Sequence, residues 1–163
     1  MPYSTNPKTT AYDPKEQLPQ HLDHKPVYAL PYQSFDGIYA GDTDIRYISL
    51  GIAQYDGDSV SIKTMRHTGG KWSRQSEELP LHRPIDMTLF LAKVIFDVAN
   101  GTVDIPSGTL INQTSDIPIT QEQRSYGEMA SYNQFLSQNK DLLQERLNSL
   151  RDVLNDLKNR GKI

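Results

Sequence analysis

Residues 45–67, IRYISLGIAQYDGDSVSIKTMRH, decide the fold of the first part of the chain. Apolar and polar side chains alternate on both sides of a central Asp-Gly pair, as they do in half-buried strands. We therefore predict two antiparallel strands, 45–54 and 58–67, joined by a hairpin turn. The apolar residues that share one face are Ile48, Leu50, Ile52, Val60 and Ile62.

The length of the turn determines how these two strands pair. A two-residue turn at Asp56-Gly57 would set Ile52 opposite Ser61 and divide the apolar residues between both faces. A three-residue turn sets Ile52 opposite Val60 and keeps them on one face, so we predict that register. Gly57 then falls at a position that favours a positive φ.

The predicted register also brings two like charges together. Arg46 is set directly opposite Arg66, and like charges at such a cross-strand pair are destabilising. Either both side chains reach into water, or a carboxylate or a ligand anion lies between them.

A polar segment follows the hairpin and leads into an apolar helix. Residues 72–79, WSRQSEEL, are predicted to form a third strand that ends at Pro80. Pro84 suits the first turn of a helix, which we expect to span 84–99 and to end at Asn100-Gly101. The residues of this helix, PIDMTLFLAKVIFDVA, are apolar nearly all round. It should therefore be buried on more than one side.

The last third of the chain predicts a long helix. Residues 101–119 are expected to form a loop with one short strand at 109–111. A capping box at 120–123 starts a helix that breaks near Gly127 and continues over 129–159. Its leucine spacing favours either a coiled-coil seam or a helix packed on its own domain. The seam consists of Leu136, Leu143, Leu147, Leu150, Leu154 and Leu157, with Lys140 as the polar exception.

Composition excludes several classes of function. The chain has 163 residues and a formal charge of −3, which argues against a phosphate-binding molecule that is basic throughout. It has no Cys, and therefore no disulfide, thiol chemistry or cysteine-based metal site. No apolar run reaches the roughly 18 residues that cross a bilayer. Residues 1–20 lack the apolar core of a secretory signal, so the expected compartment is the cytoplasm.

These patterns together predict an α+β fold with three regions. Residues 1–25, which are rich in proline, form an extended or disordered arm. Residues 26–119 form an antiparallel sheet of about four strands with one buried helix packed on it. Residues 120–163 form a long C-terminal helix.

The polar stretch at residues 66–83 is the candidate functional segment. As a binding surface, its cations would contact phosphates while its indole stacks on a base. As an enzyme site, Glu77 or Glu78 with His67 or His82 would supply an acid and a base. The structural alternative is a network of salt bridges at the end of the sheet. The predicted ligand-binding residues are Lys63, Arg66, His67, Lys71, Trp72, Arg74, Glu78, His82 and Arg83.

No motif fixes a catalytic nucleophile, a cofactor or a metal. His21 and His24 flank Asp23, but the surrounding arm offers no further ligand. We therefore predict a non-catalytic binding or interaction protein without a cofactor or metal. Its expected partners are further copies of the chain, bound through helices 84–99 and 129–159, and a protein or single-stranded nucleic acid. No membrane association is expected.

Two resemblances accompany these patterns. The run WSRQSEELPLHR at 72–83, followed by the apolar helix, resembles an uncharacterised bacterial family of unknown function over about residues 22–154. That resemblance implies no activity.

The second resemblance concerns the order strand, Asp-Gly turn, strand, polar strand and helix. This order is similar to the whirly-type single-stranded DNA-binding transcriptional coactivator domains. The resemblance implies a dimer packed through the helix that follows the sheet, with strand residues that hold single-stranded nucleic acid. By position these residues are Lys63, Arg66, Lys71, Trp72 and Arg74. The acidic net charge, Glu77-Glu78 and the long C-terminal helix depart from that pattern, and likeness of architecture does not establish function.

Overall fold

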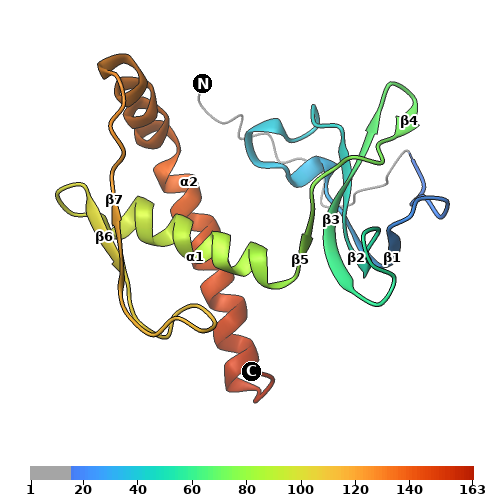
Figure 1. The fold of residues 1–163 in the computed structure, drawn as a ribbon. Helices are drawn as coiled ribbons and strands as arrows, with labels where there is room; N and C mark the ends of the chain where they lie inside the picture. The colour runs from blue at the N-terminus through green and yellow to red at the C-terminus, as the bar shows by residue number, and fades with distance from the viewer. Residues whose placement is uncertain (1–15) are drawn as a thin grey trace. The chain divides into compact units, whose positions relative to one another are not determined.

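The computed structural model describes residues 16–163 and shows an α+β fold (Figure 1), as the sequence predicts. An antiparallel sheet contains β1 (Lys25–Pro31), β2 (Ile45–Ile52), β3 (Val60–Thr68), β4 (Lys71–Trp72) and β5 (Glu78–Pro80). Its strand order is β1-β2-β3-β4, and β5 also pairs with β3. Two 3-10 helices, η1 (Gln33–Phe35) and η2 (Gly37–Tyr39), lie between β1 and β2.

The remaining elements are two helices and a hairpin. Helix α1 (His82–Asp97) is followed by β6 (Thr102–Ile105) and β7 (Ile117–Thr120), which form a separate two-stranded sheet. Helix α2 (Tyr126–Asn159) completes the described chain. Among the described residues, neither helix combines the length and the apolar character needed to cross a membrane.

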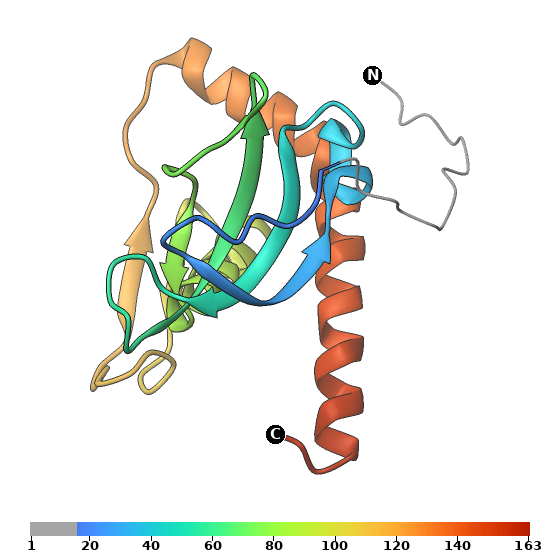
Figure 2. The same cartoon turned by 90° about the vertical axis from the view of Figure 1, so that its right-hand side faces the viewer.

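The predicted pairing of the central hairpin is confirmed. The curved strands β2 and β3 run side by side (Figure 2), with Ile52 opposite Val60 and Leu50 opposite Ile62. Side chains alternate strictly along a strand, so only one of the two possible registers keeps the apolar residues of both strands on one face.

The turn itself is built differently from the prediction. Gly57 does not adopt the positive φ that was expected. Instead Asp56 closes the turn, because its carboxylate accepts hydrogen bonds from the amide of Asp58 at 3.0 Å and the hydroxyl of Ser59 at 2.6 Å. Local side-chain bonds of this kind replace the backbone freedom of glycine.

A β-bulge removes the expected clash between two arginines. The bulge lies between Ile45 and Tyr47, so Arg66 is opposite Ile45 and not opposite Arg46. Arg46 binds the Glu16 carboxylate at 2.8 Å. Each arginine has its own carboxylate partner, so no ligand anion is needed between them.

The two faces of this sheet are buried unequally. The residues of the inner face, which are buried, are Tyr47, Ser49, Ser61, Lys63 and Met65. Leu22 packs on Tyr47 and Met65, with Leu18 partly buried beside them. The apolar residues of the hairpin therefore lie on the opposite, outer face.

Close approach of the backbone requires glycine at one position in β2. A Cβ added to Gly51 would lie 2.1 Å from the carbonyl oxygen of Lys25, where β1 pairs with β2. The register of β1 shifts between Pro26 and Tyr28 at this same place. Gly51 thus allows the edge strand to close on the hairpin.

The prediction of one continuous strand at 72–79 is wrong, because this segment forms two short strands, β4 and β5, separated by residues 73–77. β4 pairs with His67 and Thr68, whereas β5 pairs with residues 61–63. The segment 73–77 between them is longer than the part of β3 that it passes, so it leaves the ladder. It rejoins β3 where the amide of Thr64 donates to the carbonyl oxygen of Glu77 at 2.9 Å.

The predictions for the end of α1 and for the region after it are wrong. Residues 101–119 contain the strands β6 and β7, while residues 109–111 are not a strand. Val103 and Ile105 are buried, so period-two alternation was present in this segment but short. The predicted helix 84–99 with its end at Asn100-Gly101 is also wrong, because α1 spans His82–Asp97 and Ala99 pairs with Thr102. Asn100 and Gly101, with φ values of 52° and 75°, form the two-residue turn between Ala99 and Thr102.

Helix α2 is continuous and begins later than predicted. Thr120 is the last residue of β7, and the N-cap of the helix is Ser125. The Ser125 hydroxyl accepts from the amide of Glu128 at 3.2 Å, and the Glu128 carboxylate accepts from the amide of Ser125 at 2.8 Å. The helix does not break at Gly127, because this residue lies within its capped first turn.

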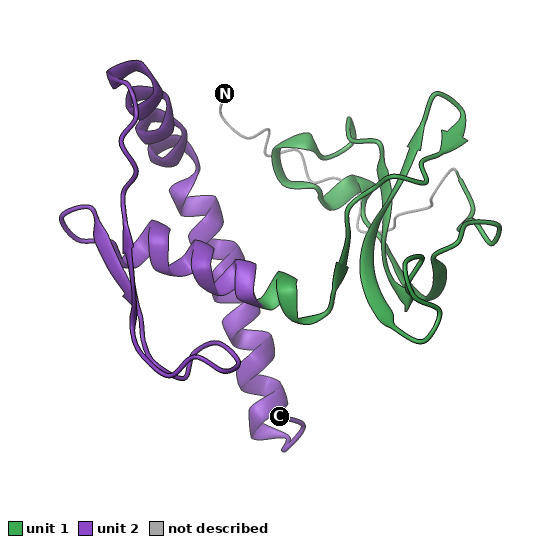
Figure 3. Ribbon diagram, in the orientation of Figure 1, with its two compact units in different colours: residues 1–85 green, residues 86–163 purple. Residues whose placement is uncertain are grey.

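The chain forms two compact units, residues 1–85 and 86–163 (Figure 3). The regions predicted from the sequence have their boundaries after residues 25 and 119 instead. Residues 16–24 pack on the sheet, since Leu22 and His24 are buried. The rest of the expected arm, residues 1–15, lies outside the described residues. No residue of α1 or α2 is buried, so the expected burial of the apolar helix is not met within one chain.

Candidate functional site

A buried polar network lies on the inner face of the sheet. His24, Ser49, Ser61 and Lys63 are each at most 1% exposed. The Ser49 hydroxyl donates to Nε2 of His24 at 2.9 Å, and Nδ1 of His24 lies 3.2 Å from Oε1 of Glu78. Because a carboxylate only accepts, Nδ1 carries the proton of a neutral imidazole.

Glu78 is the centre of this network. Its Oε1 accepts from the Ser61 hydroxyl at 2.6 Å and from the amide of Gln54 at 2.9 Å. Its Oε2 accepts from Nζ of Lys63 at 3.1 Å, and the same amine donates to the Gln54 side chain at 3.0 Å. The carboxylate is thus held by His24, which precedes β1, by two residues of β3 and by Gln54 in the turn between β2 and β3.

Burial and hydrogen bonding set the charges of the network. Desolvation lowers the pKa of His24 below its ordinary value, even though Glu78 opposes that shift. Burial alone would raise the pKa of Glu78, but bonds from Ser61, Gln54 and Lys63 together hold it below its ordinary value. A neutral imidazole beside one carboxylate and one ammonium leaves no net charge in the interior.

The order Ser49, His24, Glu78 has the connectivity of a nucleophile, a base and an orienting carboxylate. Ser49 and His24 are both 0% exposed, however. A substrate carbonyl cannot reach the Ser49 hydroxyl in this conformation, so the network positions the segment 16–24 on the sheet.

A second charged cluster lies at the other end of β3. Arg66 binds the carboxylates of Asp44 and Glu77, the latter at 2.9 Å. The hydrogen bond from Arg66, followed by one from the Thr64 hydroxyl, lowers the pKa of Glu77 to about 2. The hydroxyl of Thr68, which donates to Asp44 at 2.5 Å, is the largest cause that lowers the pKa of that carboxyl.

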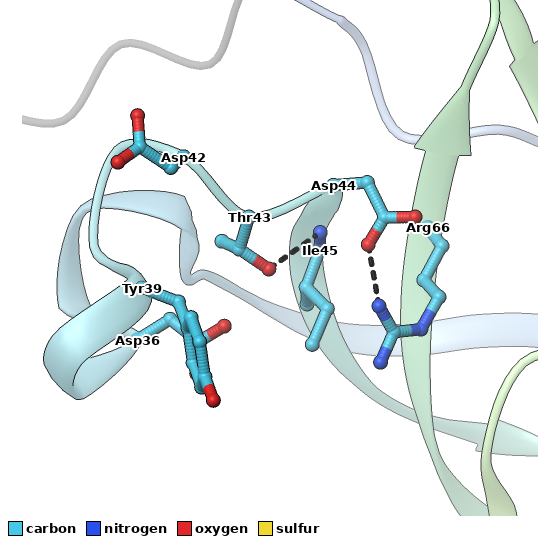
Figure 4. A pocket seen from close by; sticks show the side chains of 7 residues that line it. All are labelled: Asp36, Tyr39, Asp42, Thr43, Asp44, Ile45 and Arg66. Atoms are coloured by element: carbon cyan, nitrogen blue, oxygen red, sulfur yellow. Dashed lines mark hydrogen bonds and ion pairs between the residues drawn. The ribbon is translucent and has the colours of Figure 1, made fainter.

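A pocket of about 420 Å³ opens beside Arg66 (Figure 4). Its lining residues are Asp36, Tyr39, Asp42, Thr43, Asp44, Ile45 and Arg66. Three aspartates and one guanidinium line it, and that guanidinium already binds Asp44 and Glu77. This pocket therefore does not suit an anionic ligand such as phosphate.

Trp72 packs against the core and is half-buried. Its ring lies 6.2 Å from the ring of Tyr47 and meets His67 edge-on at 5.1 Å. The indole is thus part of an aromatic cluster that joins β4 to the hairpin.

The predicted ligand-binding residues fall into separate groups. The structure brings together Lys63 with Glu78, and His67 with Trp72. Arg66 is bound by carboxylates that were not among the predicted residues. Four further members are exposed and lie on β4, on the following loop and in the first turn of α1: Lys71, Arg74, His82 and Arg83.

The outer face of the sheet is apolar over four strands. Tyr28 on β1 is opposite Leu50, and Leu79 on β5 is opposite Ile62. Tyr28 is 73% exposed and Leu30 is 54% exposed, while Leu50 and Val60 are also exposed. The apolar residues of this face are Tyr28, Leu30, Ile48, Leu50, Ile52, Val60, Ile62 and Leu79. At its edges Lys25 is opposite Ile52, and Thr64 is opposite Ile48. Contiguous exposed apolar surface of this kind marks an interaction site.

Sequence reasoning missed both His24 and the contribution of β1 to the outer face. His24 lies far along the chain from Ser49, Ser61 and Glu78, so no local spacing reveals the contact. A signal existed for the polar face, since Ser49, Ser61 and Lys63 alternate with the apolar residues of the hairpin. That alternation alone does not say which face is covered.

Comparison with known proteins supplies a family and no activity. No curated protein and no solved structure matches this chain. A family model matches residues 16–159, which span the sheet, α1, the β6–β7 hairpin and α2. The chain belongs to a family of unknown function (DUF6530).

Proposed function

We propose that this protein is a non-catalytic interaction protein that assembles with further copies of itself. The outer face of the sheet is one interface of that assembly. The observation that carries the proposal is the unequal burial of this sheet: Ser49, Ser61 and Lys63 are buried on one face, while the apolar residues of the other face are half-buried or exposed.

The outer face suits a second copy of the same surface. Its apolar residues carry no charge, and Lys25, which is opposite Ile52, lies at the edge of the set. Two such sets therefore meet about a twofold axis without opposing like charges at their centre. Twisted antiparallel sheets pack face to face with interdigitated side chains about 10 Å apart. Burial of Tyr28, Leu30, Leu50 and Val60 would remove exposed apolar surface from water at a gain of about 25 cal/mol per Å².

The charged residues support an interaction protein more than a nucleic-acid-binding one. Lys63 is buried in an ion pair, and Arg66 is bound by two carboxylates. Trp72 packs on Tyr47, so its ring is partly used within the fold. A nucleic-acid surface needs cations and aromatic faces that are free to meet phosphates and bases.

Light scattering combined with size-exclusion chromatography tests the proposal. We expect a mass above the 18.5 kDa of one chain at micromolar concentration. Leu50→Lys places a charge in the middle of the outer face and should raise the dissociation constant at least tenfold, or about 1.4 kcal/mol. Its thermal unfolding as a single chain should change little, because the face has no cover within the unit.

Tyr55→Lys is the matched control. Tyr55 is 52% exposed and lies in the turn of the same hairpin, away from the outer face. This variant adds the same charge and should assemble as the unaltered chain does. A mass of 18.5 kDa for the unaltered chain at all concentrations would overturn the proposal, as would normal assembly of Leu50→Lys.

A further inference from the structure

Helix α2 carries an apolar seam that its own chain covers only in part. The helix has 34 residues, which correspond to a length of about 51 Å. None of its residues is buried, and Leu150 and Leu154 are 41% and 44% exposed. A helix derives most of its stability from packing of its apolar face. We therefore expect a partner helix to pack on the exposed part of this seam.

The near end of the seam is where α1 meets α2. The amine of Lys140 lies 5.3 Å from the centre of the Phe96 ring of α1. The seam beyond Lys140 contains Leu143 and Leu147, which are half-buried, and Leu150 and Leu154, which are exposed. Its midpoint falls between Leu147 and Leu150.

Charges are segregated around this seam. The acidic residues of this part of α2 occupy the side away from the leucines: Asp141, Glu145, Asp152 and Asp156. The positions that flank the leucines carry Arg146, Arg151 and Lys158. Flanking positions of this kind determine the orientation of paired helices, because they meet across the interface.

A parallel pair of α2 helices would oppose like charges. In register, Arg146 of one copy would flank Arg151 of the other, and the twofold axis would repeat that contact. Arg151 and Arg160 have acidic neighbours, Asp152 and Asp156, but both pairs are well exposed and weakly stabilising. The sequence offers no acidic flanking residue that would relieve the repulsion.

We propose that α2 pairs with α2 of a second copy in the antiparallel orientation. Leu147 then packs against Leu150 of the second copy, and Leu143 packs against Leu154. This inference rests on the proposed self-association and adds its geometry.

The antiparallel register separates the arginines that a parallel pair would bring together. Arg146 flanks Val153 of the second copy, and Arg151 flanks Gln144. Lys140 is opposite Leu157 of the second copy in the outermost layer of the pair, and its amine lies over the ring of Phe96. The two helix dipoles are also opposed rather than aligned.

Single-cysteine cross-linking tests the orientation, because the chain has no native Cys. The variants are Leu143→Cys and Leu154→Cys, examined separately and as a mixture that exchanges subunits under reducing conditions before oxidation. In the antiparallel pair, identical positions are separated by roughly 16 Å along the helices. A disulfide needs Cα atoms about 4.4–6.8 Å apart.

We expect disulfide-linked dimers on a non-reducing gel only from the mixture. Ser149→Cys, on the side of the helix away from the seam, is the control for random collision. Circular dichroism of each variant in reducing buffer establishes that α2 is folded.

Each contrary result has a distinct meaning. Efficient dimers from either variant alone would show a parallel pair and overturn the inference. An assembled protein with no cross-link above the Ser149→Cys control would show that α2 does not pair with itself, and would leave the proposed function intact. A chain that remains monomeric would overturn both.

Discussion

The sequence predicts Lys63 to be a ligand-binding residue, but the structure shows it buried in an ion pair. Read along the chain, it is a strand lysine close to other cations and suits a phosphate. In the fold it is 1% exposed and binds Glu78, Gln54 and the carbonyl oxygen of Arg74. A buried ammonium must be paired, because desolvation of an isolated charge costs several kcal/mol.

Removal of Lys63 should therefore affect stability rather than binding. Lys63→Met leaves the Glu78 carboxylate buried without its cation and should lower the free energy of unfolding by about 3–5 kcal/mol. Urea denaturation followed by circular dichroism measures this change. Lys71→Met is the control, because Lys71 is exposed on β4 and should change stability by less than about 0.5 kcal/mol. Equal effects of the two substitutions would show that the ion pair contributes nothing.

At the scale of elements, local chemistry explains the start of α2. Two sequences upstream of the helix match a capping box, one at Thr120 and one at Ser125. Pairing of β6 with β7 uses Thr120 as a strand residue opposite Thr102, so the second box caps the helix. A short strand that pairs with a neighbour outweighs a cap worth about 1 kcal/mol.

Substitution of the two capping candidates should separate their roles. Ser125→Ala removes the bond to the amide of Glu128 and should cost about 1 kcal/mol of stability. Hydrogen exchange of the amides at 126–129 should accelerate at the same time. Thr120→Ala should leave those amides unchanged, because Thr120 is exposed on β7. Faster exchange at 126–129 in Thr120→Ala would contradict the assignment of the N-cap.

The sheet illustrates which elements were predictable. The β2–β3 hairpin followed from alternation, since both strands are long and their turn is short. The division of 72–79 into β4 and β5 did not follow, because it depends on how far β3 extends beside that segment. β6 and β7 were missed since strands of four residues carry too little alternation to distinguish them from a loop.

At the scale of the whole molecule, the proposals give the chain two interfaces, the outer face of the sheet and the seam of α2. Each is isologous, so each joins two copies about its own twofold axis. The two surfaces belong to different compact units, residues 1–85 and 86–163. They should therefore be separable by mutation.

Combined substitutions should dissociate the assembly in steps. Leu50→Lys on the sheet and Leu147→Lys on α2 should each lower the mass measured by light scattering without reaching that of one chain. The double variant should elute at 18.5 kDa. Substitutions at independent sites add in free energy, which gives the double variant the sum of the two losses. A single variant that already reaches 18.5 kDa would show that only one interface joins the copies.

The sequence by itself determined the α+β class, the register of the central hairpin and the leucine spacing of α2. Each depends on residues that are neighbours along the chain, where periodicity and turn chemistry act directly. Only the tertiary structure decided which face of the sheet is buried. It also decided that His24 bonds to Ser49 and Glu78 on that face. Those outcomes depend on contacts between distant segments, such as 16–24 on β2 and β3. The energy of burying a polar face is favourable only when distant partners satisfy every donor and acceptor on it.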